Sequence, residues 1–146
     1  MKSKIIFLGV SLFLITSTGF SQKKGEIAKS IISSKVAIKK YHNKEELESM
    51  QKGTLLVLYI ERIESLAKTL PYIAFSTKPG VTLSSFGVPN SKDNRKLLDN
   101  QFEATDDYLE NTTEFQRELL PYSDTDKIVN AILFYEEIMK LLHEYN

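Results

Sequence analysis

Four carboxylates are spaced so that they fall on one side of a helix, where a row of acids can bind divalent cations. The row consists of Glu103, Asp107, Glu110 and Glu114. Carboxylate-bridged metal bundles, however, use Glu-x-x-His pairs on facing helices. In this chain Lys39 and Lys140 stand three residues before the two histidines. We therefore expect no metal site, and a row that faces solvent or the lysines of a neighbouring helix.

The two histidines, His42 and His143, are the next candidates, because a His and a Met together can hold haem inside a helical bundle. Met139 lies four residues before His143. Two side chains at this spacing point to the same side of a helix, so they cannot hold a ring from opposite faces. We expect Met139 in the core, His143 as a cation near a helix C-terminus, and no cofactor.

The residue types needed for nucleophilic catalysis are missing or wrongly spaced. The chain has no cysteine, no Gly-x-Ser-x-Gly motif and no Ser-Lys motif in a recognisable setting. Its six glycines are dispersed, so none of them forms a glycine-rich phosphate loop at the start of a helix. The lack of cysteine also excludes disulfides, thiolate zinc sites and iron–sulfur clusters. We therefore expect no enzymatic activity.

The segment from Tyr72 to Asn90 most needs a functional explanation. Its nineteen residues separate two predicted helices that a bundle usually joins with two to eight residues. It contains the apolar residues Phe75, Val81, Leu83, Phe86 and Val88. Apolar side chains in a long loop either pack on the bundle or bind a ligand.

For this segment we expect Phe75, close to a helix end, to pack on the bundle. We predict that the rest forms a recognition surface made of Val81, Leu83, Phe86 and Val88. The alternative is a crossover connection. At ~3.3 Å per extended residue the segment is long enough to run the length of a ~40 Å helix, which would let the two helices run parallel.

The first 21 residues have the features of a secretory signal peptide. Two lysines precede the apolar run from Ile5 to Ile15, which is shorter than the ~20 residues that span a bilayer. The small residues Gly19 and Ser21 fit the −3 and −1 positions of a cleavage site before Gln22. An uncleaved anchor is the alternative. We expect export to a periplasmic or extracellular location, with no membrane span after cleavage.

The remaining 125 residues, 22–146, are predicted to form a single helical domain. The 19 basic and 19 acidic residues become 17 and 19 once the two lysines of residues 1–21 are removed. This near-neutral balance argues against nucleic-acid binding. The sequence predicts an all-α fold, with about four helices in a single bundle and a long ordered loop between the second and third.

The helices are predicted from their apolar period and their end signals. The expected ranges are about 25–41, 43–70, 91–120 and 123 to near the C-terminus. Asn43 and Glu46 have the spacing of a capping box. The centre of the second helix, Leu55 to Ile60, is apolar all round and predicts the most buried helix. The tripeptide Leu-Pro-Tyr occurs at 70–72 and 120–122, where proline is expected to end each long helix.

These features together favour a protein that acts by binding another protein. We expect an exported small helical bundle, either an accessory subunit or an inhibitor-like partner of an envelope or secreted assembly. The alternative is a small-molecule or metal carrier that uses the bundle interior. The sequence does not identify the partner.

Overall fold

The computed structural model describes residues 27–144, and the predicted signal peptide, residues 1–21, lies outside this range. Four α-helices occur in it: α2 (Lys44–Glu48), α3 (Lys52–Thr69), α4 (Lys92–Leu119) and α5 (Thr125–Glu144). Short 3₁₀ turns are found at Ser34–Val36, Leu70–Tyr72, Leu83–Phe86 and Leu120–Tyr122. Within residues 27–144 there is no β-strand, only one isolated bridge between Ser30 and Thr82. The predicted all-α class is confirmed.

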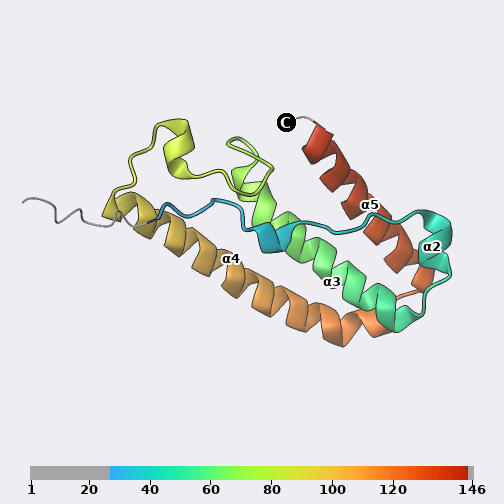
Figure 1. The fold of residues 1–146 in the computed structure, drawn as a ribbon. Coiled ribbons are helices and arrows are strands. Elements are labelled where there is room, and N and C mark those ends of the chain that lie inside the picture. Colours follow the sequence, from blue (N-terminus) through green and yellow to red (C-terminus); the bar gives the residue numbers. More distant parts are fainter. Residues whose placement is uncertain (1–26, 145–146) are drawn as a thin grey trace, which may run out of the picture.

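The prediction of a first helix over residues 25–41 is wrong for the part that the structure describes. Residues 27–43 are extended apart from the turn Ser34–Val36. Serine side chains replace the helical hydrogen bonds: the Ser30 hydroxyl donates to the Ile32 carbonyl at 2.6 Å, and the Ser33 hydroxyl accepts from the Lys35 amide. Serine competes with the backbone in this way and disfavours helix interiors. The segment is therefore extended and lies along α3 (Figure 1).

The second predicted helix, 43–70, is interrupted. The capping box at Asn43 and Glu46 is present and starts α2 as predicted. The Ser49 hydroxyl then donates to the Glu46 carbonyl, and the chain turns before α3 begins. In α3 the apolar centre is not uniformly buried, because Leu55 has 0% and Val57 67% of its surface exposed.

The later helix boundaries agree with the sequence. The Ser91 side chain accepts a hydrogen bond from the Asn94 amide and caps α4. Both Leu-Pro-Tyr tripeptides form 3₁₀ turns directly after a long helix, at the ends of α3 and α4. Proline cannot continue the helical hydrogen bonds, which explains why both helices stop there.

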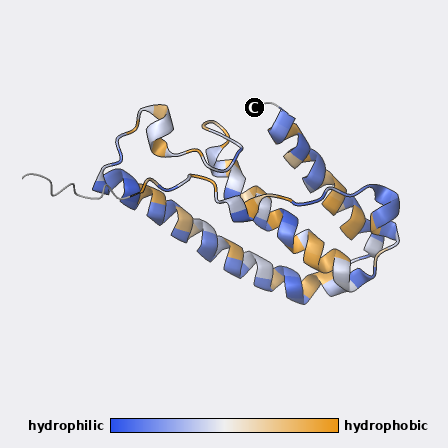
Figure 2. Cartoon of the chain, in the orientation of Figure 1, coloured by the Kyte–Doolittle hydropathy of each residue, from blue (hydrophilic) through white to orange (hydrophobic). Residues whose placement is uncertain are grey.

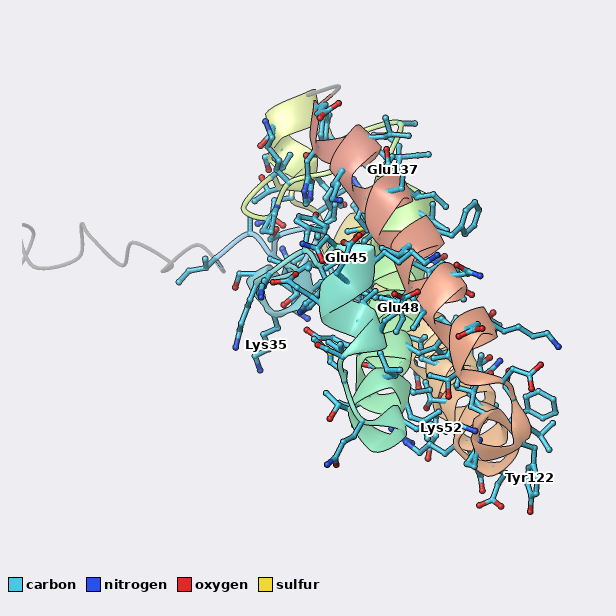
Figure 3. All side chains as sticks on the ribbon, turned by 90° about the vertical axis from the view of Figure 1, so that its right-hand side faces the viewer. Lys35, Glu45, Glu48, Lys52, Tyr122 and Glu137 are labelled. Carbon is cyan, nitrogen blue, oxygen red and sulfur yellow. The ribbon has the colours of Figure 1, made fainter. Side chains whose placement is uncertain are left out.

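The central helix is α3, with α4 on one side and α5 on the other (Figure 1). At one end Lys52 Nζ donates to the carbonyls of Pro121 and Ser123 at 2.7 Å each, so the start of α3 lies beside the α4–α5 turn. Figure 3 shows Lys52 next to this turn. At the other end the rings of Tyr72 and Phe102 are in contact, 6.2 Å between centroids. It follows that α3 and α4 are antiparallel, while α3 and α5 run in the same general direction.

The long connection, residues 73–91, lies at one end of the helices (Figure 1). Since α3 and α4 are antiparallel, it is not the crossover between parallel helices that its length permitted. It holds the extended N-terminal segment: the Ile31 amide donates to the Val81 carbonyl at 2.8 Å, and the Gly80 amide donates to the Ser30 hydroxyl at 2.9 Å. Gly80 has a φ of 92°, a left-handed conformation that glycine adopts without strain.

The core has two clusters. One is formed by Leu47, Leu55, Ile128, Val129 and Ile132, where α2, α3 and α5 meet. The other is formed by Ile31, Ile32, Tyr72 and Leu98, where the extended segment packs between α3 and α4. Figure 2 shows hydrophobic residues concentrated on α3 and α5, and α4 as mainly hydrophilic with recurring hydrophobic positions. No helix among residues 27–144 is long and apolar enough to cross a membrane.

Candidate functional site

A buried ion-pair cluster joins α3, α5 and the extended segment. It consists of Arg62, Glu136 and His42, which are 1%, 0% and 9% exposed. Glu136 Oε1 accepts from Arg62 Nε at 2.9 Å and Nη2 at 2.7 Å, and Oε2 accepts from the His42 amide at 2.6 Å. Arg62 Nη2 also donates to the Lys40 carbonyl at 2.9 Å. Because protein groups use these donors and acceptors and solvent does not reach them, the cluster fastens the extended segment to the helices.

The charge state of Glu136 follows from this environment. Burial raises the pKa of the Glu136 carboxyl, but the hydrogen bonds from His42 and Arg62 outweigh burial and leave the pKa below its usual value of 4.5. A carboxyl whose pKa is lower in the folded than in the unfolded state stabilises the fold above its unfolded pKa. That stabilisation is lost as the pH falls through the folded pKa.

We therefore expect the melting temperature to fall as the pH is lowered below about 4.5. The Glu136→Gln variant lacks this titration, so its melting temperature is lower at neutral pH and changes less on acidification. Calorimetry of both proteins between pH 7 and pH 3 measures the difference. Parallel curves for the two proteins would contradict the role given to Glu136.

The other residues considered for metal or haem binding are placed as follows. Met139 is 2% exposed in the core, as predicted, and the His143 ring bonds the Tyr41 hydroxyl at 3.0 Å near the end of α5. The carboxylate row of α4 faces solvent. Among the described residues no group of three or more His, Asp or Glu side chains is arranged to hold a metal ion.

The four residues predicted as a recognition surface do not share one environment. Val81 and Val88 are half-buried, and Leu83 packs against the second core cluster. Phe86 is 40% exposed and lies 5.5 Å from the ring of Phe75. Phe75 is 55% exposed, so the expectation that it packs away on the bundle is wrong. Phe75 and Phe86 together present an exposed aromatic pair on the loop.

We expect Phe86→Ala to lower the free energy of unfolding by only about 1 kcal/mol, the range for a partly exposed aromatic pair. Leu83→Ala is expected to cost more, about 2 kcal/mol, because Leu83 contacts the core. Urea unfolding of both variants measures these values. A loss of 3–5 kcal/mol for Phe86→Ala would mean that the ring is structural covering and not available to a partner.

The structure also contains a cavity that sequence reasoning did not predict, which we call the open groove. It has a volume of about 610 Å³ and lies between α3 and α4, with Tyr135 as the single lining residue from α5. It is lined by Tyr59, Ile63, Leu66, Ala67, Leu70, Pro71, Gln101, Ala104, Thr105, Tyr108, Thr112, Gln116 and Tyr135. None of these residues is charged. The extended segment contacts a different face of α3, where Ser65 donates to the Val36 carbonyl.

One wall of the open groove continues into an exposed uncharged strip along α4. At 100° of rotation per residue around the helix axis, seven uncharged residues of α4 fall within an arc of about 80°. This α4 strip consists of Leu97, Gln101, Ala104, Tyr108, Thr112, Phe115 and Leu119. Its four large apolar side chains are 50–67% exposed. The buried positions of α4, such as Leu98 and Leu109, lie on a different stripe.

Tyr59 of α3 and Tyr135 of α5 contact each other at the groove. The hydroxyls of Tyr59 and Tyr135 are 3.3 Å apart, and their rings are in edge contact at 5.5 Å. Burial, followed by the hydrogen bond from Tyr59, raises the pKa of Tyr135 to about 12. The Phe134 ring, 62% exposed, extends the apolar wall beside Tyr135. The pair links α3 to α5 at the uncharged groove.

A smaller cavity of about 460 Å³ lies beneath the extended segment, between α3 and α4. Tyr72, Phe102 and Val36 contribute to its walls, and Lys68 and Asp106 pair at 2.8 Å beside it. The Tyr72 hydroxyl is buried and has no hydrogen-bond partner among the described residues. A cavity of this size is in the range of small-molecule sites.

Comparison of the chain with protein-family models, with curated proteins and with solved structures finds no match to any of them. The function is therefore inferred from the geometry of the described residues alone.

Proposed function

We propose that this protein is an exported helical protein that acts by binding a helix of another protein in the open groove. The observation that carries the proposal is the α4 strip. α4 has 28 residues and is about 42 Å long. It has one apolar stripe in the core, and its α4 strip, with four large apolar side chains, is exposed beside the uncharged groove. An exposed apolar stripe on a helix is typical of a helix-in-groove binding site.

The three long helices explain why a helix suits this place. α4 and α5 flank α3 on either side, and the groove runs along α3 and α4 with Tyr135 of α5 at its edge, where a further helix can pack. Tyr59, Ile63, Leu66 and Leu70 supply a floor at helical spacing. Tyr108 and Tyr135 are aromatic anchors of the type that often dominates binding energy.

Site-specific photocrosslinking in the native extract tests this function. A p-benzoylphenylalanine at Ala104, in the groove wall, should crosslink to a partner, and the adduct should map to a helix-forming peptide. The matched control carries the same group at Glu110, which is also exposed on α4 but lies away from the strip. Equal crosslinking at both positions, or none at Ala104, would contradict the proposal.

The export part of the proposal rests on the first 21 residues. We expect secreted or envelope material to have the intact mass of residues 22–146. The double substitution Gly19→Leu with Ser21→Leu should block cleavage, because the −3 and −1 positions then carry large side chains in place of small ones. Recovery of a full-length, membrane-embedded wild-type chain would contradict export by a cleaved signal peptide.

A second candidate function is a small-molecule carrier, favoured by the 460 Å³ cavity and the unpartnered Tyr72 hydroxyl. Native mass spectrometry of protein purified from its own source would show a bound molecule, and Phe102→Trp should fill the cavity and displace it. A ligand-free spectrum in both proteins would leave protein binding as the only function proposed.

A further inference from the structure

The charges of α4 are strongly one-sided in the part of the helix that carries the strip. Every charged residue between Leu97 and Gln116 is an acid. They are Asp99, Glu103, Asp106, Asp107, Glu110 and Glu114. The bases of α4 stand outside this stretch, at Lys92, Arg95, Lys96 and Arg117. The exposed side of α4 therefore has an excess of negative charge along its middle.

Only two of these six acids are paired within the described part of the chain. Asp99 pairs with Lys29 and Asp106 with Lys68. The remaining four are the carboxylate row that the sequence showed, and among residues 27–144 none of them has an ion-pair partner. They are all exposed. Of the two expected surroundings of the row, solvent and the lysines of the first predicted helix, the structure shows solvent. The segment predicted as that helix is extended, and its Lys29 pairs with Asp99.

The helical period relates these acids to the groove. At 100° per residue, Glu118, Asp107 and Glu114 lie about 40°, 60° and 80° beyond the outer edge of the α4 strip, and the α3-facing residues lie beyond the other edge. Long basic side chains of a helix that packs on the strip can reach these outer positions, as flanking side chains do across a helix–helix contact. The groove itself is lined only by uncharged residues.

On the basis of the proposed function, we infer that the helix bound in the open groove is amphipathic and carries lysine or arginine along the flank that meets α4. Its apolar face fills the uncharged groove, and its basic flank pairs with Asp107, Glu114 and Glu118. Within residues 27–144 none of these three carboxylates forms an ion pair with another residue. Opposite charges at flanking positions set both partner choice and orientation.

A second copy of this chain is a poorer occupant. α4 carries eight acids, the six above with Asp93 and Glu118, against four bases. A contact between two copies through the α4 strips would bring together two helices that each carry four more acids than bases. Like charges across a seam disfavour such pairing.

Two synthetic helical peptides of about 18 residues test the inference. They share one Leu/Ala stripe and differ only in their flanks, which are lysine in one and glutamate in the other. With the full chain we expect the lysine peptide to bind about tenfold more tightly at low ionic strength, as three flanking ion pairs predict. The difference should shrink in about 0.5 M salt, where the screening length is only about 4 Å. Fluorescence anisotropy of labelled peptides gives both dissociation constants.

Two variants make the peptide test specific. The triple variant Asp107→Lys, Glu114→Lys, Glu118→Lys changes exposed positions only and should reverse the preference. Tyr108→Asp adds a negative charge, so non-specific attraction of the lysine peptide would increase. We expect instead that binding is lost, because the groove wall is disrupted.

The outcomes separate the charge inference from the groove function. Equal binding of both peptides, lost in Tyr108→Asp, would overturn the charge inference and leave the groove function standing. Binding of neither peptide, or binding that survives Tyr108→Asp, would contradict both. A dimer seen by analytical ultracentrifugation, and dissociated by Tyr108→Asp, would show that the occupant is a second copy and would overturn the inference.

Discussion

Replacing Glu136 with alanine is expected to lower the free energy of unfolding by about 3–5 kcal/mol, as measured by urea denaturation. The substitution leaves Arg62, 1% exposed, without the carboxylate that receives its Nε and Nη2 hydrogen bonds. It also leaves the amide of His42 without its acceptor. Arg62 then keeps only its ion pair with the half-exposed Glu61, at 3.2 Å. Removing the buried partner of a charge costs far more than a surface pair contributes.

The matched control is Glu48→Ala, which breaks the exposed Lys44–Glu48 pair on α2 and should cost less than about 0.5 kcal/mol. Replacing both buried partners, Arg62→Met with Glu136→Leu, should recover most of the lost stability, because no buried charge remains. Hydrogen exchange gives a second readout if Glu136→Ala folds poorly: in Glu136→Gln the His42 amide should exchange faster. A cost near that of Glu48→Ala would mean that the cluster does not hold the extended segment.

Tyr108→Ala is expected to weaken partner binding about 30-fold while the fold remains intact. Tyr108 is 58% exposed in the wall of the open groove, so its removal should cost little stability. Truncating an aromatic anchor at the centre of an interface typically removes about 2 kcal/mol of binding free energy, which corresponds to this change in affinity. The photocrosslinked partner, once identified, allows the affinity to be measured by calorimetry.

The control for this prediction is Tyr122→Ala, which truncates the same side chain at a position 87% exposed. Tyr122 lies at the α4–α5 turn and points away from the helices (Figure 3). Its removal should leave the affinity unchanged. Equal losses for both variants would show that the partner does not bind in the groove.

The parts of the fold with local signals were predictable from sequence. The N-caps Asn43 and Ser91 and the two prolines after the long helices act within a few residues, and they set helix ends close to the predicted ones. The segment before Asn43 was mispredicted because its apolar spacing fits a helix, whereas tertiary contacts bury Ile31 and Ile32 in an extended conformation. Serine hydrogen bonds at Ser30 and Ser33 were the local sign against a helix.

The open groove was not predictable in the same way, because it depends on how three helices are arranged. One signal was present: the apolar residues assigned to the third helix cover too wide an arc for one stripe. Leu98 and Leu109 are buried, while Leu97 and Tyr108, one residue before each, are exposed. A similar signal marks the ion-pair cluster, since Glu136 falls four residues after Ile132 and three before Met139 on the buried stripe of α5. A charged residue at such a position predicts a buried partner.

Radical footprinting of aromatic side chains, with and without the identified partner, tests most directly whether the open groove is the binding site. Four exposed aromatic residues serve as reporters, two on the α4 strip and two on the loop. We predict that Tyr108 and Phe115 become protected on binding, while Phe75 and Phe86 are labelled as in the free protein. Protection of Phe75 and Phe86 with unchanged labelling of Tyr108 and Phe115 would place the partner on the loop and contradict binding in the groove.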